Sequence, residues 1–88
     1  MTQFVLISVF DRASKTYGRV VQVASKGVAL RSFTDEVNRA AADNDLNRHP
    51  DDFDLCIVGS FDDSTGDLAP TQVESFVRAK DVINPTVG

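Results

Sequence analysis

The sequence of 88 residues contains no tryptophan, one cysteine and one histidine. A lone cysteine cannot form a disulfide within the chain, which excludes a small secreted domain held together by disulfides. Cys56 lies in the apolar run LCIVG, where a cysteine is typically a small buried side chain in a reducing compartment. Zinc sites combine several histidines and cysteines at short spacings, and no HxH or CxxC pattern occurs here. The sequence therefore predicts no metal and no cofactor.

The patterns of catalysis and of membrane insertion are also missing. The five glycines are scattered rather than gathered into a phosphate-binding loop, and no serine lies in a nucleophile elbow. The one histidine, His49, has only Cys56 as a candidate thiol, and it lies in a proline-containing stretch typical of a turn. The longest apolar run, FVLISVF, is far shorter than the ~20 residues that cross a bilayer. We therefore expect neither an enzyme nor a membrane-binding protein.

The charged residues that are present are unevenly distributed. The net charge of −4 argues against a protein whose main task is to coat nucleic acid. Nevertheless, residues 12–31 contain five cations and no acid, whereas residues 34–67 contain ten acids and two arginines. One interpretation is a pair of solvated surfaces of opposite sign. The other is that the basic part meets phosphate, or that oppositely charged surfaces of two subunits meet each other.

The basic part includes one aromatic side chain, Tyr17. Proteins bind single-stranded nucleic acid with cations for the phosphates and rings for stacking on the bases. The alternative for a lone tyrosine in a turn is local packing. The candidate residues for binding nucleic acid are Arg12, Lys15, Tyr17, Arg19, Lys26 and Arg31.

Hydrophobic periodicity predicts two strands, one helix and two further strands. The first strand (3–10) has apolar residues on both parities, which is typical of a strand buried on both faces, and residues 11–18 are expected to form a loop. The second strand is expected at 19–24. Ser25 is a candidate N-cap for a helix from about 26 to 42, with Asn44 as a left-handed stop. The last two strands are expected at 52–61, with Gly59 at a bulge or close backbone approach, and at 67 to about 73.

The C-terminal segment allows two interpretations. Thr71 and Glu74 form a capping box for a helix, but the apolar pairs that follow also fit extended chain. The predicted fold is α+β, a β-β-α-β-β antiparallel sheet with one long helix packed on one face and a tail that is extended or a short helix. We expect a single domain over residues 1–88, with a core at about 3–73 and a tail at 74–88. One helix covers one face of a sheet, so the tail or a second subunit is expected on the other face.

The stretch GSFDDSTGDLAP (59–70) contains three aspartates and could hold a metal ion or close a hairpin. The calcium-loop pattern requires an acid or amide at the positions that Ser64 and Gly66 occupy. Residues 63–66 instead fit a hairpin loop in which Gly66 takes the left-handed conformation before a bulge. The sequence therefore favours a hairpin.

Several stretches of the chain resemble the small non-structural protein of gokushoviruses, single-stranded DNA phages of the Microviridae. They are SVFDRAS (8–14), VALRSF (28–33) and HPDDFDLCIVGSFDDSTG (49–66), which fit the family's VFD, A-x-R-x-F, P-x-D-(F/Y)-x-L and G-x-F-D-D-x-T-G motifs. The resemblance covers roughly residues 8–70. It implies a protein of the host bacterial cytoplasm that acts in the switch from duplex replication to single-strand synthesis and packaging. The implied partners are the viral replication initiator or procapsid proteins and viral DNA.

Two functional hypotheses follow. In the first, the protein contacts viral DNA through its basic part. In the second, it is a non-enzymatic protein-interaction module, a homodimer or higher homo-oligomer that binds no nucleic acid. The acidic total favours the second hypothesis, and the acid-free basic stretch favours the first.

Overall fold

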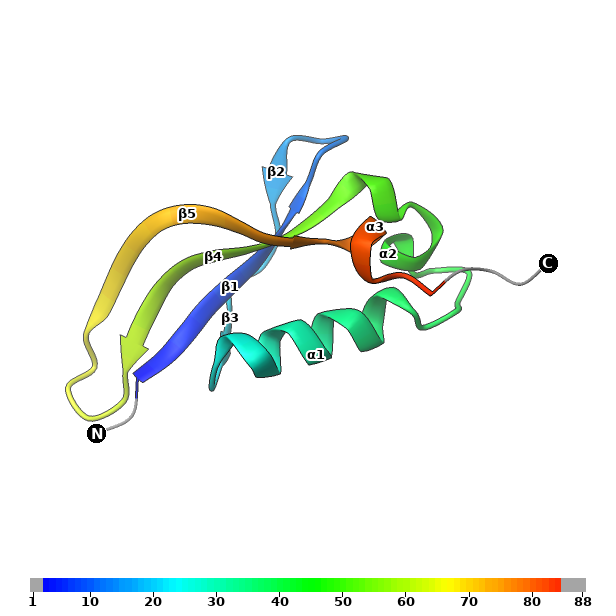
Figure 1. Ribbon diagram of the computed structural model, residues 1–88. Helices are drawn as coiled ribbons and strands as arrows, with labels where there is room; N and C mark the ends of the chain where they lie inside the picture. The colour runs from blue at the N-terminus through cyan, green and yellow to red at the C-terminus, as the bar shows by residue number, and fades with distance from the viewer. Residues whose placement is uncertain (1–2, 85–88) are drawn as a thin grey trace.

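The computed structural model of the protein describes residues 3–84, which form an antiparallel sheet and several helices (Figure 1). The strands are β1 (Gln3–Asp11), β2 (Thr16–Tyr17), β3 (Val21–Val23), β4 (Phe53–Asp62) and β5 (Leu68–Arg78). The helices are α1 (Lys26–Val37), α2 (Asp45–Arg48), the 3₁₀ turn η1 (Pro50–Asp52) and α3 (Ala79–Val82). The predicted α+β class with an antiparallel sheet is confirmed.

The strand order is β2-β1-β4-β5, and β3 pairs with the same edge of β1 as β2 does. The predicted order had four strands. The structure has five, because the stretch expected to be a loop contains the short strand β2, whose Tyr17 pairs with Phe10. The predicted second strand is shorter than expected, and β5 is longer.

The core lies where α1 crosses the sheet. Side chains alternate between the two faces of a strand, so Ile7 of β1 and Leu55 of β4 share one face. These side chains form one buried cluster with Ala29, Phe33 and Val37, which recur on one side of α1. Helix α1 therefore contributes its apolar side to the core. The opposite face of the sheet, which carries Phe10 and its neighbours in register, is here called the outer face.

Helix α1 begins as predicted and ends earlier than predicted. The Ser25 side chain accepts a hydrogen bond from the Val28 amide at 3.2 Å, which caps the first turn. The helix ends at Val37 instead of continuing to residue 42. Asn44 has φ −103° rather than a left-handed conformation, and it is the N-cap of α2.

Asparagine side chains explain where α1 stops, because they satisfy the last carbonyls of the helix. The amide of Asn38 donates to the Thr34 carbonyl at 2.9 Å and to the Val82 carbonyl at 3.0 Å. The Asn44 amide donates to the Glu36 carbonyl at 2.8 Å, and the Asn47 amide donates to the Val37 carbonyl at 3.0 Å. These contacts tie the end of α1 to α2 and α3.

The C-terminal segment combines both conformations that the sequence allowed. It is extended through Arg78 and then forms the single turn α3, so the capping box of Thr71 and Glu74 is not used. Ala79 is fully buried and belongs to the core cluster, although it lies in the segment predicted as a tail. Since α3 contacts α1 and η1 and Ala79 belongs to the core cluster, residues 79–82 pack on the side of α1 rather than on the outer face.

The two ends of the sheet differ. At the closed end, residues 53–57 of β4 lie among β1, α1 and α3, and Leu55 is 1% exposed. At the open end, residues 58–73 of the β4–β5 hairpin extend away from the helices (Figure 1), and Leu68 is 69% exposed. Gly59 marks the transition, and the register shifts there against both neighbouring strands. A Cβ on Gly59 would lie 2.8 Å from the Ala69 carbonyl oxygen, which confirms the predicted close backbone approach.

Candidate nucleic-acid interface

Pairing across four strands places four side chains in one row at the closed end. Tyr17 of β2 is opposite Phe10 of β1, Phe10 is opposite Asp54 of β4, and Asp54 is opposite Arg78 of β5. Directly paired residues point to the same face of a sheet. Their neighbour Leu55 faces α1, so the row lies on the outer face. We call Tyr17, Phe10, Asp54 and Arg78 the charged row.

The first half of the charged row is aromatic. The ring centroids of Phe10 and Tyr17 lie 4.7 Å apart, with the ring planes inclined by 45°. Phe10 is partly buried, whereas Tyr17 is 51% exposed. Tyr17 therefore packs locally, as one interpretation of the sequence expected, and still presents ring surface on which a base can stack.

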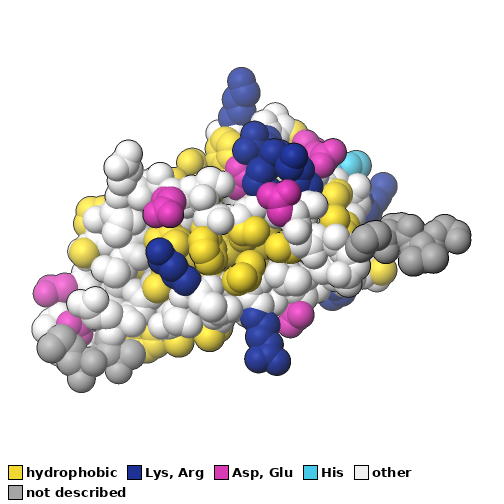
Figure 2. Space-filling view, viewed as in Figure 1, with side chains coloured by type: hydrophobic (Ala, Val, Ile, Leu, Met, Phe, Trp, Pro, Cys, Tyr) yellow, Lys and Arg dark blue, Asp and Glu magenta, His cyan; other side chains and the backbone are white. Residues whose placement is uncertain are grey.

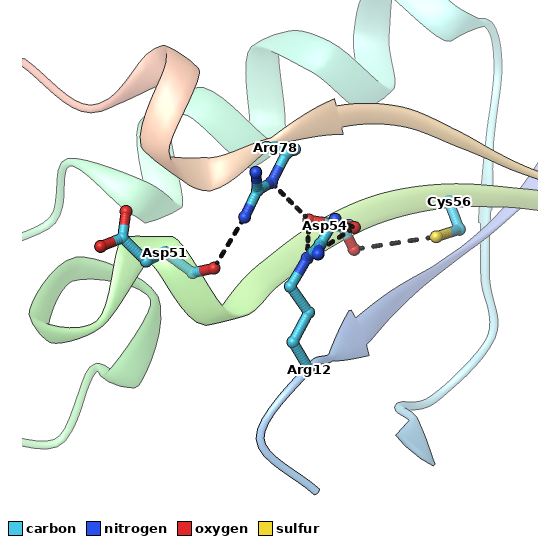
Figure 3. Close-up of polar contacts among 5 residues, drawn as sticks. All are labelled: Arg12, Asp51, Asp54, Cys56 and Arg78. Carbon is cyan, nitrogen blue, oxygen red and sulfur yellow. Dashed lines mark hydrogen bonds and ion pairs between the residues drawn. The ribbon is translucent and has the colours of Figure 1, made fainter. Parts of the chain in front are cut away.

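The second half of the row is a buried carboxylate between two arginines (Figure 3). Asp54 is 3% exposed. Arg12, which follows β1, donates to both of its carboxylate oxygens, from Nε at 3.1 Å and from Nη2 at 2.8 Å. Arg78 donates from Nε to Asp54 Oδ1 at 3.3 Å and from Nη2 to the Asp51 carbonyl at 3.0 Å. Two guanidinium charges thus share one carboxylate.

The pKa values of two groups at this site, Arg12 and Cys56, are raised above their ordinary values. Hydrogen bonding to Asp54 raises the pKa of the Arg12 guanidinium above its ordinary value, so Arg12 is always charged. Burial raises the pKa of the Cys56 thiol, and the Asp54 charge adds to this effect. Cys56 is 3% exposed and its Sγ lies 4.0 Å from the Asp54 carbonyl oxygen. The expectation of a small buried thiol is confirmed.

The other sequence candidates divide between two elements. Lys15 closes the turn after β1 with φ 60°, its amide donating to the Asp11 carbonyl at 2.7 Å, and Arg19 lies between β2 and β3. Both side chains are exposed beside β2. Lys26 and Arg31 lie on α1 instead, and Lys26 Nζ is 6.0 Å from the centroid of the Phe76 ring. The structure therefore places Tyr17 in the charged row and pairs Arg12 with Asp54 of that row. Lys15 and Arg19 lie near Tyr17 in the chain, and Lys26 and Arg31 lie on a different element.

Sequence reasoning missed Phe10, Asp54 and Arg78 as parts of this site. Asp54 appeared only among the acids, and Arg78 lay in the segment whose conformation was left open. The available signal was the alternation of β4, which puts a carboxylate between two apolar residues that face the core. A charged residue at such a position needs a partner.

Cationic side chains gather in Figure 2 on the side of the molecule where Figure 1 draws β2 and the end of β5, with acidic side chains beside them. Hydrophobic side chains occupy the middle of the same view. The local field is therefore of mixed sign, and the cations are available as individual contacts rather than as one broad positive surface.

The acidic stretch 59–70 forms the hairpin that the sequence favoured. Gly66 has φ +79°, the predicted left-handed conformation, and its amide donates to the Asp62 carbonyl at 2.8 Å. The Asp62 carboxylate accepts from the Ser64 hydroxyl at 2.7 Å and from the Ser64 amide at 2.8 Å. These hydrogen bonds lower the pKa of the Asp62 carboxyl. The carboxylate thus stabilises the turn.

The fold and the row define a small α+β domain with an aromatic and arginine-bearing outer face. Among residues 3–84, no helix is long and apolar enough to cross a membrane. Residues 4–82 match the family model of the Phage ORF5 protein, so the chain belongs to that family of phage accessory proteins. It is 38% identical to Protein ORF5 of Chlamydia phage 1, a gokushovirus of the Microviridae, over 65 residues that cover 72% of this chain and 68% of that protein. The resemblance to gokushoviruses is thereby confirmed. No solved structure is significantly similar to the chain.

Proposed function

We propose that this phage accessory protein acts in the switch from viral DNA replication to single-strand synthesis and packaging, in the cytoplasm of the host bacterium, by binding single-stranded viral DNA. In this proposal the protein is not an enzyme and needs no metal or cofactor. Family membership supports the phage context. The observation that carries the DNA contact is the exposed ring of Tyr17 in the same row as Asp54, whose carboxylate holds Arg12 and Arg78.

Single-stranded DNA offers bases with open π faces and a regular series of phosphates. The Tyr17 ring packs against the ring of Phe10, and this contact limits the motion of Tyr17 and supports its stacking on a base. Lys15 and Arg19 flank Tyr17 in the chain and are exposed, so they can contact phosphates on either side of a stacked base. Few cations take part, so we expect weak binding that depends strongly on salt.

The test is fluorescence anisotropy of a labelled oligo-dT of twelve nucleotides, measured against protein concentration at several salt concentrations. We expect binding at low salt that weakens as salt is added. Tyr17→Ala should weaken binding by roughly fivefold to a hundredfold, since stacking on an aromatic side chain contributes about 1–3 kcal/mol per base. Tyr17→Phe keeps the ring and should bind nearly as the wild-type protein does.

A matched control is Leu30→Ala, which removes a partly exposed side chain from α1, far from β2 in the sequence. Absence of binding at the lowest salt would contradict DNA contact. Equal affinities of the Tyr17→Ala variant and the control would contradict the stacking role.

A second candidate function, binding to a further copy of this chain, is favoured by the open end of the outer face. Leu6, Val20, Val58, Leu68 and Pro70 line a groove of about 410 Å³ there. Val20 and Leu68 are 56% and 69% exposed, so pairing of two copies would remove apolar surface from water. Light scattering at micromolar concentration decides this alternative, because a mass equal to one chain contradicts it. Replication-initiator or procapsid proteins would be partners of the same surface.

A further inference from the structure

The cluster of Arg12, Asp54 and Arg78 carries more positive charge than its own carboxylate compensates. Asp54 supplies one negative charge, and both arginines make hydrogen bonds to it. Two guanidinium groups that approach the same carboxylate also repel each other. The cluster therefore keeps a surplus of one positive charge, fixed at the end of the charged row.

Donors remain at this cluster. The hydrogen bonds among the described residues use Nε and Nη2 of each arginine, which leaves the Nη1 groups for other acceptors. The side chains of Arg12 and Arg78 are 45% and 29% exposed, whereas that of Asp54 is 5% exposed. Water and solutes therefore reach the arginines but hardly reach the carboxylate that holds them.

The carboxylates of Asp51 and Asp11, which lie near the cluster in the sequence, do not cancel its surplus positive charge. Asp51 contributes its carbonyl to Arg78, and in Figure 3 its carboxylate points away from the cluster. Asp11 is engaged elsewhere, since its Oδ1 accepts from the amides of Ala13 at 2.9 Å and Ser14 at 3.3 Å. Among residues 3–84, the ion pairs of Arg12 and Arg78 are thus those with Asp54.

We propose that Arg12 and Arg78, oriented by the buried Asp54, form a binding site for a phosphate group. Arginine offers a planar fork of N–H donors that matches phosphate oxygens, and orientation by a fixed carboxylate lowers the entropy lost on binding. On the proposed function, this site holds a backbone phosphate of the single strand whose base stacks on Tyr17. The same chemistry would also accept free inorganic phosphate.

The chain contains a matched comparison for this proposal. Just after α1, Arg39 donates to Glu36 of the helix with nearly the same geometry as Arg12 to Asp54, from Nε at 3.1 Å and from Nη2 at 2.7 Å. That pair has one arginine and one carboxylate, so it has no surplus charge. Its carboxylate side chain is 44% exposed, in contrast to that of Asp54. Arg39 is therefore the control for the response of an ordinary surface ion pair to phosphate.

The first arm of the test is NMR of the arginine Nε–H groups of the wild-type protein, titrated with sodium phosphate and separately with sodium chloride at equal ionic strength. We expect phosphate to shift the Nε–H signals of Arg12 and Arg78 more than that of Arg39, and chloride to shift none of them selectively. Shifts that are equal for all three arginines, or that chloride reproduces, would overturn the proposal. This arm requires no variant to fold and no DNA binding.

The second arm uses the labelled oligo-dT with Arg78→Gln, Arg12→Gln and the control Arg39→Gln. Each of the first two variants should weaken binding by about threefold to tenfold and reduce the slope of log affinity against log salt by about 0.7, the value for one phosphate of a single strand. Variants that match Arg39→Gln in both quantities, while the wild-type protein binds, would refute the DNA phosphate as the ligand. If the wild-type protein binds no oligo-dT, the proposed function fails, and the first arm still decides whether the site takes phosphate.

Discussion

At the closed end of the sheet, β4 lies between β1 and β5 and under α1, whereas at the open end the same strand continues into a hairpin that no helix covers. Leu55 and Leu68 are both apolar strand residues, yet they are 1% and 69% exposed. The hydrogen bonds between β4 and β5 therefore continue into the open end, although the side chains there are no longer buried. The charged row lies at the closed end, on strands that the core supports.

The largest expected effect comes from the core of the closed end. Leu55→Ala should lower the free energy of unfolding by about 2–5 kcal/mol, because it leaves a cavity among Ile7, Phe33 and Ala79. Leu68→Ala at the open end should change it by no more than about 0.5 kcal/mol. Urea denaturation of both variants measures these values. Similar losses for the two variants would contradict the division of the sheet into a packed and an uncovered end.

A smaller effect is expected where the two ends join. Gly59→Ala places a Cβ 2.8 Å from the Ala69 carbonyl oxygen, so the hairpin strands must move apart. Overpacking of this kind typically costs about 1–3 kcal/mol. Gly27→Ala is a suitable control, because its Cβ would meet only the Ser25 side chain at 3.8 Å and it lies in a helix. Hydrogen exchange of Gly59→Ala should show faster exchange in the hairpin than at the closed end, and uniform acceleration would contradict this account.

The smallest effect concerns the tip of the open end. Hydrogen bonds from Ser64 lower the pKa of Asp62 in the folded state, so this carboxylate stabilises the fold above its unfolded pKa of about 3.9. That contribution is lost as the pH falls through the folded pKa. Asp62→Ala should therefore lower the melting temperature at pH 7 slightly and make it less dependent on pH below about 4. Asp67→Ala removes the same charge from the loop but none of the hydrogen bonds from Ser64, so it is the control, and identical profiles of the two variants would contradict the role of Asp62.

Much of the fold could be predicted from local patterns. The alternation of β1 and β4, the apolar side of α1, the Ser25 cap and the left-handed Gly66 all depend on neighbours within a few residues. The end of α1 could not be predicted in this way. It depends on the side chains of Asn44 and Asn47, which reach back to carbonyls eight and ten residues earlier.

The site was predicted only in part for the same reason. Arg12 and Tyr17 were recognisable as a cation and an aromatic residue in one basic stretch. Arg78 lies 24 residues after Asp54 and 66 residues after Arg12 in the sequence. Strand pairing brings it to the same site, and composition does not reveal this pairing. The register of β5 also includes shifts near Leu55 and Ile57, so even a correct strand prediction would not have given the partner of Asp54.

The most direct test of the central claim, that the charged row at the closed end is the DNA-binding surface, is NMR mapping of the wild-type protein with unlabelled oligo-dT of twelve nucleotides. The amide signals and ring signals of Phe10 and Tyr17, and the signals of Asp54 and Arg78, should shift most and with a common dissociation constant. The NMR signals of residues 63–70, at the tip of the open end, should not shift. Shifts confined to that tip or to the exposed side of α1, with the row unchanged, would contradict the claim.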